Sequence, residues 1–225
     1  MRIIYNYDDF IANLLEAGMT IGGGNAEGTF SLCSYFGESI CWHTDNPDTD
    51  PWEWKMRVLN ERRDIAYGKF FYKKSGFITK EWFPYFYAVR RKNMIFEEAY
   101  LEGTLSSHAK RIYNILTEHK ELPLHLIKQY GGFTREEKSR FDAAITELQM
   151  RMYITMCGGA RKLSQKGEEY GWFSTVFCLT EDFFSGENLS NRIIEYEEAF
   201  QKIEKQLYSL NPAAKPVKVR KFITG

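Results

Sequence analysis

The sequence places a histidine and an aspartate where they could act together as an acid–base pair. His43 and Asp45 stand in the segment Trp42-His43-Thr44-Asp45, with one residue between them. A neighbouring carboxylate can fix the tautomer of an imidazole and prepare it for proton transfer near neutral pH. The alternative is a loop whose polar groups bond only to the backbone. His43 and Asp45 are therefore the catalytic candidates, and no other catalytic residue is predicted.

A second group of residues could bind nucleic acid. The segment from Tyr67 to Tyr87 is dense in aromatic residues, and lysines are interleaved with them. Aromatic faces stack on bases while cations hold phosphates, so such a segment could grip an unstacked base. The alternative is that most of these rings fill the core of a helical layer and only a few line a pocket. The pocket candidates are Trp42, Tyr67, Lys69 and Trp82.

The sequence lacks the residue spacing that is typical of metal sites and of phosphate-binding loops. Cys33, Cys41, Cys157 and Cys178 lie far apart and form no C-x-x-C pair. They have no His or Cys partners at zinc-ligand spacing, so we expect no metal and no cofactor. Gly22-Gly23-Gly24 lacks the Gly-Lys-Ser/Thr of a P-loop. Separated cysteines are typical of reduced thiols, which favours a cytoplasmic protein.

Charge balance limits how the chain could bind a polyanion. Its 225 residues include 30 basic and 30 acidic residues, so the formal net charge is zero. This balance argues against a protein held on nucleic acid by its overall charge alone. Binding would require a local basic face. The N-terminus has no apolar signal core, and no apolar run approaches the ~20 residues that span a bilayer. We expect no membrane association.

The second half of the chain has the order of a winged helix-turn-helix unit. Two helices come first, and a third begins with the capping-box pattern Thr134–Glu137. A pair of strands comes next, with Gly158-Gly159 as a break after the first strand. This layout can place the third helix in a DNA major groove, although such units also serve as structural cores. The expected helices are Ser106–Lys120, Leu124–Tyr130 and Thr134–Gln149, with a turn at Glu121–Pro123 and strands at Met152–Cys157 and Tyr170–Leu179.

Basic residues of this unit are candidates for contacts with phosphates, which position a nucleic acid rather than specify its sequence. Acidic residues share the third helix, so an ordinary solvated face is the alternative. The nucleic-acid-binding candidates are Lys128 on the second helix, Arg135, Lys138 and Arg151 along the third, and Arg161 and Lys162 in the wing.

The remaining segments complete a fold that is mainly α with a small β part, an α+β class. Helices are expected at Phe10–Ala17, from Pro51 to about Tyr67, and at Lys80–Arg90. The amphipathic segment Asn191–Leu210 could pair with a second copy in a homodimer or pack on its own domain. The expected divisions are an aromatic-rich, partly winged-helix-like region at 1–103, the winged helix at 104–184, the amphipathic helix at 185–211, and a flexible basic tail at 212–225.

Read together, the aromatic segment and the unit after it resemble a known family. Asp50–Lys92, with Glu61-Arg62-Arg63 before "AYGKFF" and Trp82-Phe83-Pro84 before Arg90-Arg91, is similar to winged-helix DNA glycosylases of the AlkZ/YcaQ type. The "TELQMRMYI" of Thr146–Ile154 adds to the likeness, which covers roughly residues 28–184. The chain resembles the small AlkZ-related proteins more closely. The resemblance implies winged helices around a basic channel and base excision without a metal.

The chain departs from that family at its catalytic motif. The family has Gln-apolar-Gln or Gln-apolar-Asp shortly before the matched segment, where this chain has Thr29–Ser34 without glutamine. Gln149 belongs to the later unit, so no catalytic residue is carried over. The primary hypothesis is a DNA-binding relative of the glycosylases. The alternatives are a base-excising hydrolase with altered catalytic groups, and a protein-interaction or small-ligand module that keeps only the scaffold.

Overall fold

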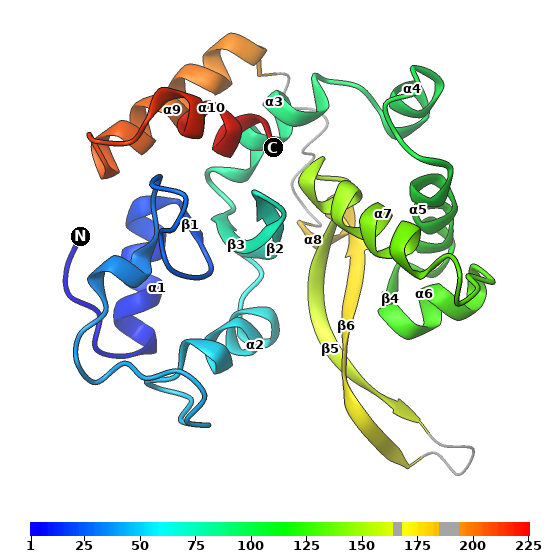
Figure 1. Cartoon of the computed structure of the whole chain (residues 1–225), viewed down its shortest axis with the longest axis horizontal. Coiled ribbons are helices and arrows are strands. Elements are labelled where there is room, and N and C mark those ends of the chain that lie inside the picture. The colour runs from blue at the N-terminus through cyan, green and yellow to red at the C-terminus, as the bar shows by residue number, and fades with distance from the viewer. Residues whose placement is uncertain (164–167, 185–193) are drawn as a thin grey trace.

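Two lobes stand side by side in a computed structural model that describes residues 1–163, 168–184 and 194–225 (Figure 1). The fold is mixed, with more helix than strand, as the sequence predicts. One antiparallel sheet runs through both lobes in the strand order β1-β3-β2-β5-β6-β4. Among the described residues, every helix is too short or too polar to cross a bilayer.

The first lobe contains α1 (Tyr7–Ala17), β1 (Met19–Ile21), η1 (Leu32–Tyr35), α2 (Pro51–Glu61), β2 (Ile65–Phe71), β3 (Lys74–Thr79) and α3 (Phe83–Arg91). Its helix ends follow local rules. The Asp50 side chain accepts the Trp52 N–H at 2.8 Å and caps α2, with Pro51 at the first helical position, as predicted. Gly18, at φ 84°, ends α1 in the left-handed region that glycine favours.

The second lobe contains α4 (Phe96–Leu101), α5 (Ser107–His119), β4 (Glu121–Pro123), α6 (Leu124–Tyr130), α7 (Lys138–Met150), β5 (Ile154–Leu163), β6 (Glu169–Leu179) and α8 (Thr180–Phe183). Ser106 caps α5 by accepting the Ala109 N–H. On α7, Phe141, Ile145 and Leu148 form a buried apolar stripe. The β5–β6 hairpin extends away from the helices (Figure 1).

Each lobe has its own hydrophobic core, and the chain returns to the first lobe at its end. The first core contains Leu14 and Phe71 together with Ile203 and Phe222, which lie on α9 (Tyr196–Leu210) and α10 (Pro216–Thr224). The second core is built from residues between Phe96 and Leu179. On α9, Ile203 and Leu207 are buried within their own chain, and Tyr196, Phe200 and Leu210 are partly buried against the same core, so the structure gives no support to the homodimer prediction.

The lobes join where β2 meets β5 and α7. Tyr67 pairs with Met156, and the Thr155 hydroxyl donates to the Tyr67 carbonyl at 3.1 Å. The Lys69 N–H donates to Gln149 Oε1 at 2.9 Å. Gly68 permits this approach, because a Cβ there would lie 2.9 Å from the Phe70 ring and 3.3 Å from Gln149 Oε1. Gln149 is therefore a structural residue of the junction.

A buried arginine holds the lobes and the C-terminus together. The guanidinium of Arg90 donates to the carbonyls of Phe70 at 2.7 Å, Met150 at 2.9 Å, Phe222 at 2.8 Å and Ile223 at 2.9 Å. Three of these carbonyls lie at the last turns of α7 and α10, where helices leave acceptors unpaired and concentrate negative charge. Burial lowers the pKa of Arg90 to about 9, so the side chain stays charged at neutral pH.

Two predictions for the first lobe are wrong. The helix that begins at Pro51 ends at Glu61 rather than near Tyr67. The first half of the aromatic run, from Tyr67 to Phe77, forms the hairpin of β2 and β3 instead of a helical layer, whereas the second half lies on α3. Aromatic residues suit strands as well as helices, and a turn without Asn-Gly gives no local hairpin signal. The helix expected from Lys80 begins at Phe83.

Four predictions for the second lobe and the C-terminal segment also need correction. The segment Glu121–Pro123 is the strand β4 rather than a turn, since it pairs with β6. Strand β5 continues through Gly158-Gly159 with a shift of register. In the expected capping box, Glu137 accepts the Thr134 N–H at 2.9 Å, but α7 begins only at Lys138. The expected basic tail contains the packed helix α10. The predicted start of the amphipathic helix at Asn191 lies outside the described residues.

Replacing Arg90 should destabilise the whole molecule. Arg90→Met leaves four buried carbonyls without this donor, and each unpaired buried group costs about 1–3 kcal/mol. We expect the free energy of unfolding in urea to fall by more than about 3 kcal/mol. The matched control is Arg62→Met, which removes a surface ion pair with Asp64 and should cost at most about 1 kcal/mol. Equal losses in the two variants would contradict this role of Arg90.

Candidate nucleic-acid interface

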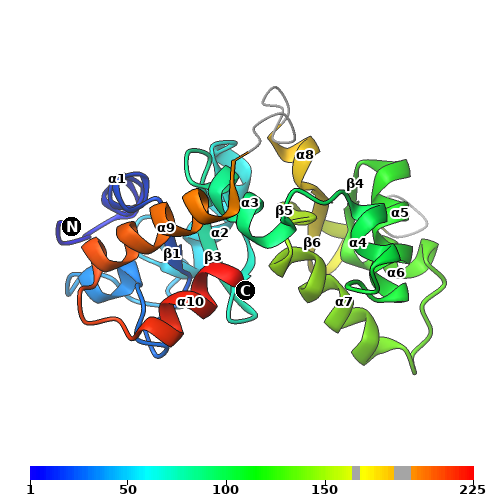
Figure 2. The ribbon, with the colours of Figure 1, turned by 90° about the horizontal axis from the view of Figure 1, so that it is seen from above.

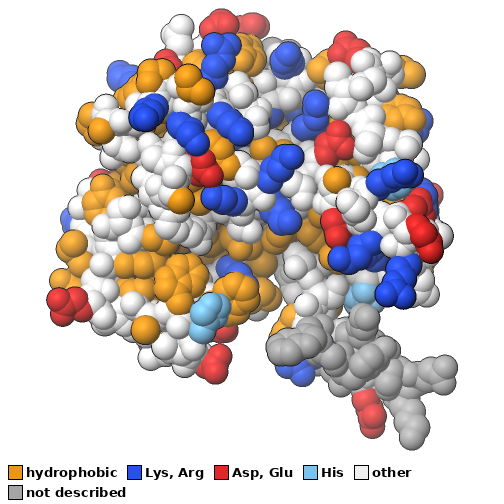
Figure 3. Space-filling model, viewed as in Figure 1, with side chains coloured by type: hydrophobic (Ala, Val, Ile, Leu, Met, Phe, Trp, Pro, Cys, Tyr) orange, Lys and Arg blue, Asp and Glu red, His pale blue; other side chains and the backbone are white. Residues whose placement is uncertain are grey.

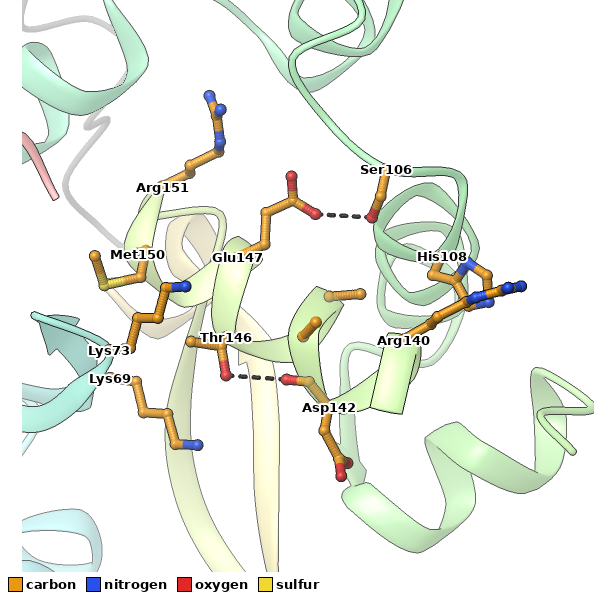
Figure 4. A pocket seen from close by; sticks show the side chains of 12 residues that line it. Lys69, Lys73, Ser106, His108, Arg140, Asp142, Thr146, Glu147, Met150 and Arg151 are labelled. Atoms are coloured by element: carbon orange, nitrogen blue, oxygen red, sulfur yellow. Dashed lines mark hydrogen bonds between the residues drawn. The ribbon is translucent and has the colours of Figure 1, made fainter. Parts of the chain in front are cut away.

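A groove lies between the two lobes. This central groove, a cavity of about 820 Å³, lies between α7 and the N-terminus of α5 on one side and the β2–β3 turn on the other. Figure 4 shows the side chains of Lys69 and Lys73 pointing from β2 and the turn toward α7. The charged side chains that line the groove are the basic Lys69, Lys73, Arg140 and Arg151 and the acidic Asp142 and Glu147.

Helix α7 presents one face to the second core and another to the groove. Phe141 and Leu148 point into the core, while Arg140, Glu147 and Arg151 line the groove at spacings of seven and four residues. These spacings place three charged side chains along one side of a helix. The packed stripe therefore sets the orientation of the charged stripe.

The β2–β3 turn is strained, and its strain places a lysine at the groove. Tyr72 and Lys73 adopt φ angles of 53° and 62°, in the left-handed region that costs a residue with a side chain about 1–2 kcal/mol. The Tyr72 hydroxyl donates to the Lys218 carbonyl of α10 at 2.6 Å, and its ring packs on Phe222. These contacts offset part of the strain, which is often found at functional sites.

One carboxylate ties the basic helix α10 to this turn. Glu27 accepts from Lys74 Nζ at 2.9 Å and from Lys218 Nζ at 2.8 Å. The hydrogen bonds from Lys218 and Lys74 lower the pKa of Glu27 to about 2, so it is charged at neutral pH. Lys221 lies 6.0 Å from the centre of the Tyr72 ring. The basic residues of α10 thus adjoin those of the groove.

Basic side chains form a band on this face, although the net charge is zero. Figure 3 shows Lys and Arg side chains running from the region of α9 and α10 across the β2–β3 turn to α7. Figure 2 shows α7 and α10 along the same side of the molecule and α8 on the opposite side. Among the described residues, Lys69, Lys73, Arg140 and Arg151 have no carboxylate partner within ion-pair distance. These four cations are available to an external anion.

Glu147 brings a carboxylate into the basic groove. Its Oε2 accepts from the Ser106 hydroxyl at 2.7 Å, as Figure 4 shows. Ser106 also caps α5, so the same side chain fixes both the start of that helix and the position of the carboxylate. Asp142, the other acid in the groove, lies 3.7 Å from the amine of Lys138. A held carboxylate among cations can orient a water molecule or a substrate hydroxyl.

The predicted phosphate contacts are spread over the second lobe. Of the six, Arg151 lines the central groove, whereas Lys138 is ion-paired with Asp142. Arg135 is exposed ahead of α7. On α6, the amine of Lys128 lies 4.9 Å from the centre of the Phe141 ring. Arg161 lies over the exposed ring of Phe173 on the hairpin. Lys162 belongs to β5, and its side chain is outside the described part.

The catalytic candidates lie apart from the groove in a tight loop. His43 and Asp45 have φ angles of 62° and 58°, and among the described residues no hydrogen bond joins their side chains. The His43 ring instead lies 5.0 Å from the ring of Trp52. Their catalytic role stays a prediction.

The pocket candidates fall in three places. Trp42 and Tyr67 line a second cavity of about 350 Å³, whereas Lys69 lines the central groove. Trp82 packs over Gly18, where an added Cβ would lie 2.1 Å from its ring.

Sequence reasoning missed Arg140 as a residue of the groove and did not single out Lys73. Arg140 could have been found from its spacing to Glu147 and Arg151 on the polar side of α7. For Lys73 the sequence carries no such signal, because its position depends on a hairpin turn that ordinary turn residues do not mark.

Two further findings bear on function. In the part of the chain that the structure describes, no group of three or more His, Cys, Asp and Glu side chains could hold a metal ion. A family model described as AlkZ related matches residues 4–224. Comparison with curated proteins and with solved structures gives no match.

Glycine in place of Lys73 should stabilise the protein. Glycine adopts a positive φ without the side-chain cost of about 1–2 kcal/mol but has a greater entropy loss of about 0.5–1 kcal/mol, so Lys73→Gly should gain about 0.5–1 kcal/mol. Lys73→Gln removes the charge and keeps the strain, so its unfolding free energy should match wild type. Urea unfolding measures both, and a less stable Lys73→Gly protein would show that the turn is not strained.

Proposed function

The chain belongs to the AlkZ-related family, and we propose that it binds duplex DNA along the basic band and the central groove. The observation that carries this proposal is the gathering of unpaired cations from both lobes on one hollowed face of a neutral protein. Contacts with phosphates supply most of the sequence-independent affinity of such proteins.

The order of elements in the second lobe supports a winged helix-turn-helix assignment. Elements α5, β4, α6, α7, β5 and β6 follow one another, and β4 pairs with the edge of the hairpin through β6. In this proposal α7 is the recognition helix and the hairpin is the wing. The groove-facing Arg140 and Arg151 would then contact the DNA backbone beside the major groove.

The first lobe repeats this order. Elements α1, β1, η1, α2, β2 and β3 correspond one by one to those of the second lobe, and β1 pairs with β3 as β4 pairs with β6. We infer two winged-helix units in tandem, with the central groove between them. This arrangement agrees with the basic channel that the resemblance to winged-helix glycosylases implies.

Removing single cations of the groove should weaken DNA binding uniformly across sequences. Lys69→Gln, Lys73→Gln and Arg151→Gln should each lower the slope of log affinity against log salt by about 1. Fluorescence anisotropy with a short labelled duplex at low salt measures this. The matched control is Lys120→Gln, because Lys120 lies 3.7 Å from Asp182 of α8, on the opposite side of the molecule. Failure of the wild-type protein to bind at micromolar concentration would remove the proposal.

Glu147 favours a second candidate function, a base-excising hydrolase. The carboxylate held by Ser106 could activate a water molecule in a groove that binds DNA. Glu147→Gln should then lose at least about a hundredfold in the release of bases from alkylated duplex, scored as abasic sites. His43→Ala tests the other catalytic candidate in the same assay. Wild-type protein without detectable release would leave DNA binding as the function.

A further inference from the structure

The second cavity has the size of a small-ligand pocket. This indole pocket, of about 350 Å³, lies on the first lobe between α2, the glycine loop after β1, and the β2–β3 hairpin. Pockets for small molecules begin near this volume, at about 300 Å³. The residues that matter for its chemistry are Trp42, Trp52, Lys55, Tyr67, Lys74 and Phe77.

Two indole rings at this pocket are open to solvent. The exposed fractions of Trp42 and Trp52 are 39% and 48%, whereas Phe77 is buried and its ring centre lies 4.7 Å from that of Tyr67. Tyr67 and Phe77 thus form a packed floor, and the indoles form open walls. Burying an aromatic side chain is strongly favourable, so two tryptophans left open beside a cavity offer stacking surface to a planar ligand.

A buried carboxylate fixes the backbone that carries the two tryptophans. Asp50 accepts the N–H groups of Thr44 at 2.7 Å, Asp45 at 3.2 Å and Trp52 at 2.8 Å. It therefore joins the loop that carries Trp42 to the start of the helix that carries Trp52. The positive φ angles of His43 and Asp45 show that this loop is held in a costly conformation. The backbone beneath the pocket walls is therefore preorganised.

The charge of the pocket selects for an anion. Lys55 Nζ lies 3.0 Å from the centre of the Trp52 ring, and Lys74, whose amine also binds the Glu27 carboxylate at 2.9 Å, lines the same cavity. Among the described residues that line the pocket, none is acidic. A methylated ammonium group, which aromatic cages also bind, would be repelled by these lysines. A planar ring that carries a phosphate matches both the rings and the cations.

The pocket opens beside the central groove. Tyr67 lines the pocket and Lys69 lines the groove, and the two residues stand two positions apart on β2. Side chains two positions apart lie on the same face of a strand, about 6–7 Å from each other. A strand bound in the groove could therefore deliver one nucleotide to the pocket.

We propose that the indole pocket binds one unstacked nucleotide, with its base against Trp42 and Trp52 and its phosphate near Lys55. The nucleotide can come from an unpaired position in bound DNA or from a free mononucleotide. The first source rests on the proposed function of the groove, and the second does not.

A comparison of two duplexes that differ in one nucleotide distinguishes binding at the pocket from binding at the groove. Wild-type protein should bind a duplex with one unpaired adenosine about tenfold more tightly than the fully paired duplex, measured by anisotropy. Trp52→Ala and the milder Lys55→Gln should lose this difference and keep the affinity for the paired duplex. The control Tyr130→Ala removes an equally exposed ring from the second lobe and should change neither affinity. Circular dichroism confirms that the variants are folded.

Titration with dAMP, monitored by quenching of tryptophan fluorescence, tests whether the pocket binds a free mononucleotide. Quenching by dAMP that is weaker in both Trp52→Ala and Lys55→Gln would support the pocket. If neither duplex bound in that case, only the proposed function of the groove would be removed. Equal affinity of wild-type protein for the two duplexes, together with no quenching by dAMP, would overturn the pocket and leave the groove function standing.

Discussion

The positive charge of Arg90 is the constraint on which the arrangement of the molecule depends. Its guanidinium gathers the ends of α7 and α10 and the β2 backbone at one buried point, and no carboxylate of the described residues pairs with it. Helix C-termini carry partial negative charge and unpaired carbonyls, and a planar cation with five donors can satisfy several of them at once. The positions of the two lobes and of the last helix are thereby coupled.

This coupling gives the groove its shape. Because α7 and β2 are held together, the charged side of α7 faces the β2–β3 turn, and α10 lies against the same turn through Tyr72 and Glu27. The strain at Tyr72-Lys73 persists because these surrounding contacts outweigh it. A neutral chain thus acquires a basic face through placement of its cations, since acidic residues such as Asp182 pair on the opposite side.

The two cavities on this face differ in chemistry because different residues of one hairpin line them. The groove is larger and lined by charged side chains, whereas the indole pocket is smaller and aromatic. Both depend on locally costly backbone, at Lys73 and at His43, that neighbouring contacts hold in place. Because these cations and rings stand on backbone that is already ordered, little further conformational entropy is lost when a ligand binds.

The sequence by itself determined the features that depend on near neighbours. Asp50 and Ser106 marked helix starts, the α7 stripe marked a packed face, and the motifs of Asp50–Lys92 indicated the family. Only the tertiary structure decided that Lys69 and Lys73 face α7, that β2 and β3 form a hairpin, and that the C-terminal segment is a packed helix. These outcomes depend on contacts between residues as much as 191 positions apart, such as Glu27 and Lys218, and local propensity carries no information about such contacts.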